Sequence, residues 1–247
     1  MAEALTVAAP DAHYAIIIER GARLNLASRL GARRAVVVTN TTVAGLHGNE
    51  LTETLPNCAL LALPDGEQYK SLDTVASLYR DLVKAGLDRN GVIVAFGGGV
   101  VGDTAGFAAA SFMRGVALIQ IPTTLLSMVD SSVGGKVGVD LPEGKNLVGA
   151  FKQPECVLID PDYLSTLPVK EWRCGMAEVL KHGLLADPEL LNPELWSPER
   201  APEMIRRAVQ VKIDVVERDP YEKSIRAHLN LGHTFAHAIE SVTQYTW

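Results

Sequence analysis

The sequence has few cysteines, and no spacing pattern joins them. Only three occur among 247 residues, Cys58, Cys156 and Cys174, and no two form a Cys-x-x-Cys pair. A disulfide framework or a thiolate zinc site requires cysteines that are numerous or closely spaced, so the sequence indicates neither. We therefore expect free thiols and a protein of the reducing cytoplasm.

Long apolar segments and an excess of positive charge are also missing. No run approaches the roughly 20 apolar residues that a membrane-spanning helix needs, and the N-terminal stretch lacks the pattern of a signal peptide. The net charge is -6, which argues against a nucleic-acid or anionic membrane partner. With 47% hydrophobic and 21% charged residues, the composition is that of a globular protein able to bury a sizeable core.

The first 160 residues alternate strand-like apolar runs with helical patterns. A helix is predicted over residues 71–85, closed by Gly86. Strands separated by helices predict βαβ units and a parallel sheet. The short apolar runs that predict strands are residues 16–18, 35–38, 58–63, 91–96 and 116–121.

The pattern changes near Asp160-Pro161, after which strand-like runs disappear. Helices are predicted over residues 171–185, 202–218 and 231–242, with prolines between the first two. The sequence therefore predicts two domains. An α/β domain covers residues 1–160, and a mostly helical domain covers residues 161–247.

A glycine-rich turn follows the strand-like run at 91–96. Gly97, Gly99 and Gly102 fit the pattern Gly-x-Gly-x-x-Gly and precede a predicted helix of small residues over 104–111. Glycines let the backbone approach a diphosphate, and a helix N-terminus offers N–H donors to an anion. The alternative is a plain turn between a strand and a tightly packed helix. No acidic residue stands where a ribose-binding carboxylate would follow, so the pattern departs from a standard Rossmann fold.

Two further segments combine lysines with glycines and polar side chains. Residues 122–136 contain Asp130 and end in Lys136, and residues 144–151 contain Lys145 and Asn146. Ammonium groups beside free backbone N–H groups suit a phosphate or carboxylate ligand. The alternative is a pair of solvated loops.

Carboxylate and histidine side chains recur at helical spacing in the second part of the chain. Glu178 and His182 are i, i+4, as are His233 and His237. Such pairs are suitable zinc ligands, and a catalytic zinc commonly has three protein ligands. Helix packing or solvent exposure is the alternative for each pair. Spacing alone does not choose three ligands among Glu178, His182, His233, His237 and Glu240.

Taken together, these segments resemble the signature blocks of the 3-dehydroquinate synthase family, in the order and with the spacing of that family. The resemblance extends from about Tyr14 to the last residue. The blocks are DGEQYKS (65–71), GGGVVGD (97–103), MRG (113–115), PTTLLSMVDSSVGGK (122–136), GKNLVGAFKQP (144–154), GMAEVLKHG (175–183) and LNLGHTFAHAIE (229–240).

The resemblance implies an N-terminal α/β domain that binds NAD and a helical domain that carries a divalent metal, zinc or cobalt. Glu178 and His233 would be metal ligands, whereas His182 has no corresponding role in the family. The nucleotide would be approached by Asp65, Glu67, Lys70, Gly99, Val100, Asp103, Thr123, Thr124, Asp130, Lys136 and Lys145.

The resemblance also implies a substrate, 3-deoxy-arabino-heptulosonate 7-phosphate, and a homodimer. Arg114 is similar to an arginine that reaches the phosphate site of a neighbouring subunit. The substrate's phosphate, carboxylate and hydroxyls would be held by Lys181, Asn146, Lys212, Arg226 and His237. The implied reaction is transient oxidation by NAD, β-elimination of phosphate, re-reduction and an internal aldol closure, with the metal as a Lewis acid.

One family feature is not found. The family's third metal ligand is a histidine in a later His-Gly-Glu-Ala-like block, and this sequence ends at Trp247 before that block. We expect from this a C-terminally truncated chain that holds metal weakly, exposes apolar helix faces and has little activity. The alternatives are a sister sugar-phosphate cyclase, a metal-dependent polyol or alcohol dehydrogenase, and a non-catalytic NAD-binding fragment.

Overall fold

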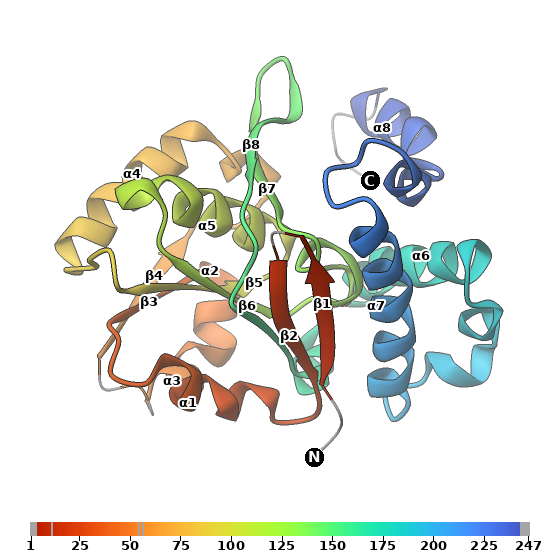
Figure 1. Cartoon of the computed structure of the whole chain (residues 1–247), viewed down its shortest axis with the longest axis horizontal. Coiled ribbons are helices and arrows are strands. Elements are labelled where there is room, and N and C mark those ends of the chain that lie inside the picture. Colours follow the sequence, from red (N-terminus) through yellow and green to blue (C-terminus); the bar gives the residue numbers. More distant parts are fainter. Residues whose placement is uncertain (1–3, 11, 54, 56, 243–247) are drawn as a thin grey trace.

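The computed structural model describes residues 4–10, 12–53, 55 and 57–242, without the side chains of residues 237, 238, 240 and 241. Its centre is a seven-stranded sheet in the order β1-β2-β9-β6-β5-β3-β4 (Figure 1). Neighbouring strands are parallel except β1 and β2, which confirms the predicted parallel sheet. The strands are β1 (Leu5–Ala9), β2 (Ala12–Ile18), β3 (Ala35–Asn40), β4 (Cys58–Leu63), β5 (Val92–Gly97), β6 (Ala117–Pro122) and β9 (Cys156–Ile159).

Both faces of this sheet are buried, because successive side chains of a strand point to opposite faces. Val37 and Val94 belong to a core shared with α1 and α3, whereas Val36 and Ile93 belong to a core shared with α4 and α5. Figure 1 shows α4 and α5 on one side of the sheet and α1 and α3 on the other. The helices of this half are α1 (Leu26–Leu30), α2 (Thr41–Val43), α3 (Asn49–Thr52), α4 (Leu72–Lys84) and α5 (Gly99–Ser111), with the shorter turns η1 (Ala22–Asn25), η2 (Ala44–Gly48), η3 (Glu67–Tyr69), η4 (Phe112–Arg114) and η5 (Ser127–Ser131).

The chain around Lys136 and Lys145 forms a separate hairpin rather than the pair of solvated loops considered as the alternative. β7 (Lys136–Leu141) pairs antiparallel with β8 (Gly144–Phe151), outside the main sheet. Gly138 and Gly149 pair directly, and a Cβ on Gly138 would lie 2.7 Å from the carbonyl oxygen of Val148. The glycines that suggested loops therefore permit close approach of two strands.

Beyond residue 160, every described element is helical. α6 (Val169–Leu185) and α7 (Ala201–Arg218) pack together, and α7 also lies beside β1, where the Ala8 amide donates to Glu217 Oε1 at 2.7 Å (Figure 1). The three predicted helices are confirmed within two residues at their starts, as α6, α7 and α8 (His233–Val242). Their connections are η6 (Pro161–Thr166), η7 (Pro188–Leu191), η8 (Pro193–Trp196) and η9 (Ile225–Asn230).

The strand order creates a topological switch point at the carboxyl ends of β3 and β5. The chain runs from β3 to its neighbour β4 on one side, and then returns to β5 on the other side of β3. In open α/β sheets, ligands bind outside the carboxyl ends of strands at such a switch point. Asn40 at the end of β3 and Gly97 at the end of β5 mark this position.

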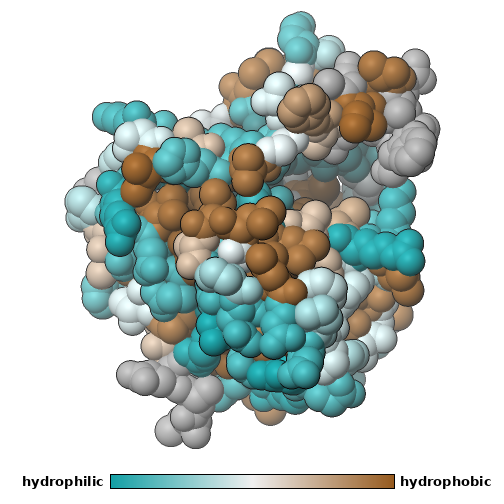
Figure 2. Space-filling view, turned by 90° about the vertical axis from the view of Figure 1, so that its right-hand side faces the viewer, coloured by the Kyte–Doolittle hydropathy of each residue, from teal (hydrophilic) through white to brown (hydrophobic). Residues whose placement is uncertain are grey.

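Helix α8 carries exposed hydrophobic side chains. Phe235, Ile239 and Val242 expose 79%, 55% and 85% of their surface. Figure 2 shows separate hydrophobic side chains, in brown, at the upper right of the molecule. Among the described residues, no helix combines the length and apolarity needed to cross a membrane.

Candidate active site

A cavity of about 600 Å³ lies at the switch point, between the carboxyl ends of β3 to β6 and η6. We call it the turn-side cavity. It brings together eight of the predicted nucleotide-binding residues. They are Asp65, Glu67, Lys70, Gly99, Val100, Asp103, Thr123 and Thr124.

The glycine turn forms the floor of this cavity. β5 ends at Gly97, and α5 begins at Gly99 rather than at the predicted Thr104. Gly98 precedes the helix in extended conformation, and a Cβ there would lie 3.1 Å from Thr124 Cγ2. Gly98, Gly99 and Val100, at the N-terminus of this 13-residue helix, line the cavity, and the first N–H groups of a helix have no partner within it. Thr123 Oγ1 is buried there without a hydrogen-bond partner. These features fit a diphosphate-bearing nucleotide.

Lys70 connects the turn-side cavity to the β7–β8 hairpin. Its buried ammonium lies 2.6 Å from Asp103 Oδ2 and donates to Asn146 Oδ1 at 2.6 Å. Burial raises the pKa of Asp103, and the charge of Lys70 opposes that rise. Asn146 adopts a left-handed backbone conformation, with φ 56, at this contact. Lys70 therefore fixes two polar side chains from different elements.

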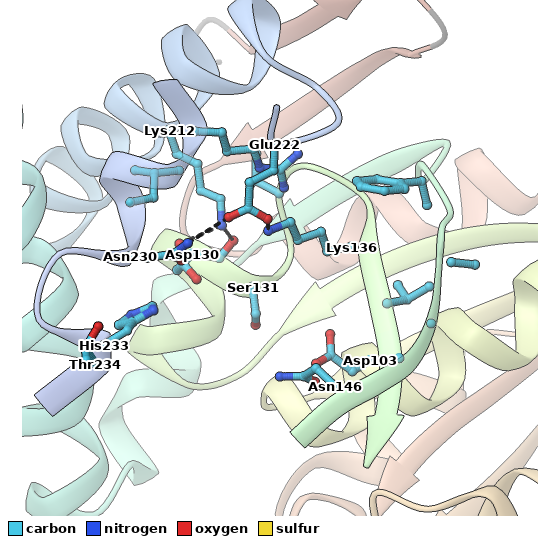
Figure 3. Close-up of a pocket in the computed structure, with 18 residues that line it drawn as sticks. Asp103, Asp130, Ser131, Lys136, Asn146, Lys212, Glu222, Asn230, His233 and Thr234 are labelled. Carbon is cyan, nitrogen blue, oxygen red and sulfur yellow. Dashed lines mark hydrogen bonds and ion pairs between the residues drawn. The ribbon is translucent and has the colours of Figure 1, made fainter. Parts of the chain in front are cut away.

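A second cavity, of about 920 Å³, adjoins the first and shares Asp103 and Ser131 with it. We call it the cationic cavity, after Lys136, Lys212 and Arg226 in its wall. Figure 3 shows Lys136, Asp103 and Asn146 on one side and His233 and Thr234 on the other. Its lining also includes the predicted residues Asp130, Asn146 and His233.

Lys212 on α7 binds the turn that follows β6. Its Nζ donates to Asp130 Oδ1 at 2.6 Å and to the Asp130 carbonyl oxygen at 2.5 Å. Burial opposes ionisation of Asp130, but Lys212 and Lys181 outweigh it and hold the pKa of that carboxyl below its usual range. The pair is thus charged, with the lysine supplying the counter-charge.

Arg226 is held against the backbone of the loop before β7. Its guanidinium donates to the carbonyl oxygens of Pro220 at 2.6 Å and Gly134 at 3.1 Å. Gly134 has φ 97, and a Cβ there would lie 2.5 Å from Arg226 Nη2. Glycine is therefore required for this approach, which directs a buried cation toward the cavity.

Glu178 and His233, the two metal ligands implied by the resemblance, come together. Glu178 Oε1 lies 3.6 Å from His233 Nε2, and its other oxygen pairs with Lys181. Burial would raise the pKa of Glu178, but the contacts with His233 and Lys181 hold it below its usual value. An ionised carboxylate beside an imidazole is a suitable pair of ligands for zinc or cobalt.

His182 lies in the same cluster, although the resemblance gives it no role. Its ring offers a nitrogen within a group formed with carboxylate oxygens of Asp130 and Glu178, all within 4.8 Å of one another. The ring is fully buried, and neither nitrogen has a hydrogen-bond partner. Burial lowers the pKa of His182 to about 4, aided by Lys212 and Lys181 against the effect of Asp130. The donor set fits a divalent cation. Of the five candidates from spacing, His182 and His233 each lie close to Glu178, and the side chains of His237 and Glu240 lie outside the described part of the chain.

Lys145, Lys181 and Arg114 are three predicted residues that do not line either cavity. Lys145 lines neither cavity and lies 3.5 Å from Glu67 Oε1. Lys181 forms an ion pair with Glu178. Arg114 is exposed on η4, with φ 67, and lines neither cavity. His237 belongs to α8, but its side chain lies outside the described part of the chain.

Several lining residues were not predicted from the sequence. Asn40 is the last residue of the buried parallel strand β3, so its position at a carboxyl end was a usable signal. Glu222 and Asn230 enter the cationic cavity from the helical part, and nothing in their local pattern marks Glu222. The other unpredicted polar residues of the turn-side cavity are Thr42, His47, Tyr69, Ser131, Tyr163, Thr166 and Glu171.

Two family models match consecutive parts of the chain. The model described as 3-dehydroquinate synthase N-terminal matches residues 60–174, and the model described as 3-dehydroquinate synthase C-terminal matches residues 175–247. A 3-dehydroquinate synthase of Microcystis aeruginosa is 44% identical over 264 aligned residues, which span 100% of this chain and 72% of the relative.

Solved structures of two cyclases are similar over most of the chain. A 2-deoxy-scyllo-inosose synthase complexed with carbaglucose-6-phosphate, NAD+ and Co2+ is 30% identical, with a TM-score of 0.88 over 98% of this chain and 71% of that one. A 2-epi-5-epi-valiolone synthase from Streptomyces hygroscopicus with NAD+ and Zn2+ bound is 32% identical, with a TM-score of 0.86 over 94% of this chain and 69% of that one.

Proposed function

Since this chain belongs to the 3-dehydroquinate synthase family, we propose that its two joined cavities convert 3-deoxy-arabino-heptulosonate 7-phosphate to 3-dehydroquinate and phosphate, a step of the shikimate pathway. The observation that carries the proposal is the continuity of the two cavities through Asp103 and Ser131. A nucleotide in the first is thereby next to a cation-lined space in the second. The Glu178–His233 pair lies beside that space, because His233 lines it.

The turn-side cavity is the proposed NAD site. The first turn of α5 offers N–H groups to the diphosphate, with Gly99 and Val100 beside it. Thr123 and Thr124 present hydroxyls from the end of β6. Asp65 is anchored by the Thr42 amide at 3.2 Å, and Lys70 orients Asp103. Polar groups fixed in this way orient a cofactor without rearranging on binding.

Glu178 and His233 are the proposed metal ligands, with Asp130 and His182 close by. When bound, NAD supplies a hydride acceptor and the divalent cation supplies a Lewis acid. Lys181 and Lys212 keep Glu178 and Asp130 ionised in their buried positions. Neutral His182 adds no positive charge to the cluster.

The cationic cavity is the proposed substrate site. Lys212 and Arg226 present positive charge to the carboxylate, and Asn146 presents an amide to the phosphate or a hydroxyl. Lys136 positions the leaving phosphate, which itself takes the proton in β-elimination. These side chains therefore orient the substrate and exclude water rather than exchange protons. Lys181 and His237 complete the proposed set.

The test is a side-by-side assay of the chain with NAD and cobalt or zinc. The heptulosonate phosphate should release phosphate and form 3-dehydroquinate, detected by mass spectrometry, without net change in nicotinamide absorbance. Net formation of NADH would indicate a dehydrogenase instead. NAD binding without turnover of any sugar phosphate would support a non-catalytic NAD-binding protein.

A second candidate is a sister sugar-phosphate cyclase, favoured by the similarity to the inosose and valiolone synthases. Sedoheptulose 7-phosphate and glucose 6-phosphate in the same assay distinguish it. Turnover of either, with none of the heptulosonate phosphate, would replace the first assignment.

We further propose a cytoplasmic homodimer. Cys58, Cys156 and Cys174 are all free thiols, which suits a reducing compartment. Arg114 lies on η4 next to exposed Met113, is itself exposed and lines neither cavity. The exposure of this guanidinium supports the proposal that it reaches the phosphate site of a second subunit.

A further inference from the structure

Glu222 is one of three acidic side chains in the cationic cavity, and the other two, Asp103 and Asp130, are paired with the buried lysines Lys70 and Lys212. The Glu222 carboxylate pairs with Lys136 Nζ and accepts from Asn230 Nδ2 at 2.8 Å. Figure 3 shows it between those two side chains, which come from β7 and from η9. Glu222 thus spans the cavity between the hairpin and the helical part of the chain.

The backbone holds Glu222 in place at some strain. Its φ is 54, in the left-handed region that a residue with a Cβ seldom adopts. Asp219 fixes the loop by accepting from the amides of Lys223 at 2.8 Å, Ser224 at 2.7 Å and Arg226 at 3.1 Å. A strained residue maintained by its surroundings at a ligand cavity suggests a functional constraint.

The other two cations of the cavity have partners on neighbouring backbone or turns rather than across the cavity. Lys212 is paired with Asp130 on a neighbouring turn, and Arg226 is held by backbone carbonyls. Lys136 instead meets a carboxylate from the opposite wall. Burial, together with the charges of Arg226 and Lys212, lowers the pKa of Lys136 to about 8. Without an anion nearby, this lysine would be a poorly compensated charge.

We propose that the Glu222 carboxylate competes with an anionic ligand for Lys136 and Asn230. It occupies the position of the ligand's anionic group and is displaced when a phosphate binds. This deepens the proposed function by adding a regulator to the same site. The side chain of Glu222 is 24% exposed and that of Lys136 45%. Ion pairs this exposed contribute little, so a phosphate with more charge and more acceptor oxygens displaces the carboxylate readily.

The experiment measures the affinity of the full chain for inorganic phosphate, by 31P NMR titration and by the rise in melting temperature at constant ionic strength. Glu222→Gln removes the charge and keeps the shape. Removing the competitor should tighten phosphate binding by about two- to fivefold, the range expected for an exposed ion pair. Glu222→Gly, which also suits φ 54, should tighten it at least as much.

Two controls test whether a change in phosphate affinity arises from the Glu222–Lys136 pair. Glu203→Gln removes a carboxylate that pairs with Arg200 at 2.8 Å on the surface of α7, and it should leave phosphate affinity unchanged. In a Lys136→Met background, Glu222→Gln should no longer tighten binding, because the contested cation is gone. Unchanged or weaker phosphate binding in both Glu222 variants would overturn the proposal and would make Glu222 a positioning residue.

The phosphate titration and the activity assay can fail separately. Tighter phosphate binding in a chain that forms no 3-dehydroquinate would support the competing role of Glu222 and refute the proposed activity. Normal turnover with weaker phosphate binding in the Glu222 variants would support the activity and refute the competing role.

Discussion

Lys212 binds both the carboxylate and the backbone carbonyl of Asp130, at 2.6 and 2.5 Å. One side chain on α7 therefore fastens the helical part of the chain to the turn after β6. The contact is buried at the lysine, whose side chain is only 6% exposed. Loss of either partner leaves the other charge without compensation.

Substitution of Lys212 by Met should destabilise the protein by about 2–3 kcal/mol. A fully buried pair would cost about 3–5 kcal/mol, but Asp130 is 27% exposed and water screens part of the charge. Urea unfolding followed by circular dichroism gives the free energy of unfolding. Lys84→Met is the matched control, because its partner Asp81 and Lys84 itself are exposed by 40% and 76%. Equal stabilities of the two variants would contradict the prediction.

Substitution of Gly99 by Val should weaken NAD binding by about tenfold or more, which corresponds to about 1.4 kcal/mol. A Cβ at Gly99 meets Ser131 Oγ at 3.4 Å, so the added methyl groups extend into the turn-side cavity. Isothermal titration calorimetry with NAD measures the loss. Gly45→Val is the control, since no atom lies within 4 Å of its Cβ. Retained affinity in Gly99→Val would place NAD elsewhere.

Substitution of Glu178 by Gln should weaken cobalt binding by about tenfold or more, because an amide is a poorer ligand than an ionised carboxylate. The visible absorption spectrum of added Co2+ and calorimetry both report on this binding. NAD affinity should remain unchanged. Glu203→Gln serves as the control on a neighbouring helix. A normal cobalt titration in Glu178→Gln would remove this residue from the metal site.

Anion binding to the cationic cavity should fall as the pH rises through about 8. The pKa of Lys136 is lowered to about 8 by burial and by Arg226 and Lys212, so this lysine is protonated below that pH and neutral above it. Sulfate is a suitable probe, since its charge is constant over the range. Lys136→Arg should retain binding at pH 9, because an arginine stays charged. A wild-type affinity independent of pH between 7 and 9 would refute the assignment.

Mixing two inactive variants tests the proposed role of Arg114 across a dimer. Arg114→Ala should bind NAD normally but lose turnover, and Lys136→Met should lose turnover by damaging its own phosphate site. Mixed dimers then contain one site with an intact Lys136 and an intact Arg114 from the partner. Unfolding and refolding the two together should restore part of the activity. No restoration, with dimers present in analytical ultracentrifugation, would place Arg114 outside the site.

The local pattern of apolar residues was sufficient to predict most strands of the sheet. β4 has the predicted bounds Cys58–Leu63, and α4 begins after a Ser71 cap whose hydroxyl accepts from the Thr74 amide. The hairpin β7–β8 was missed because its glycines conceal the alternation of side chains. α5 was predicted to begin too late, since Gly99 and Val100 have weak intrinsic helix preference and are helical here because Val101 is buried against the sheet.

The sequence by itself determined the alternation of strands and helices, the glycine turn after β5 and the family to which the chain belongs, because each is carried by residues adjacent or regularly spaced along the chain. Only the tertiary structure decided which distant side chains meet. Glu178 reaches His233 across two helices, Lys70 joins Asp103 to Asn146, and Glu222 stands between Lys136 and Asn230. These contacts depend on how α6, α7 and the hairpin pack together, and local spacing contains no information about that packing.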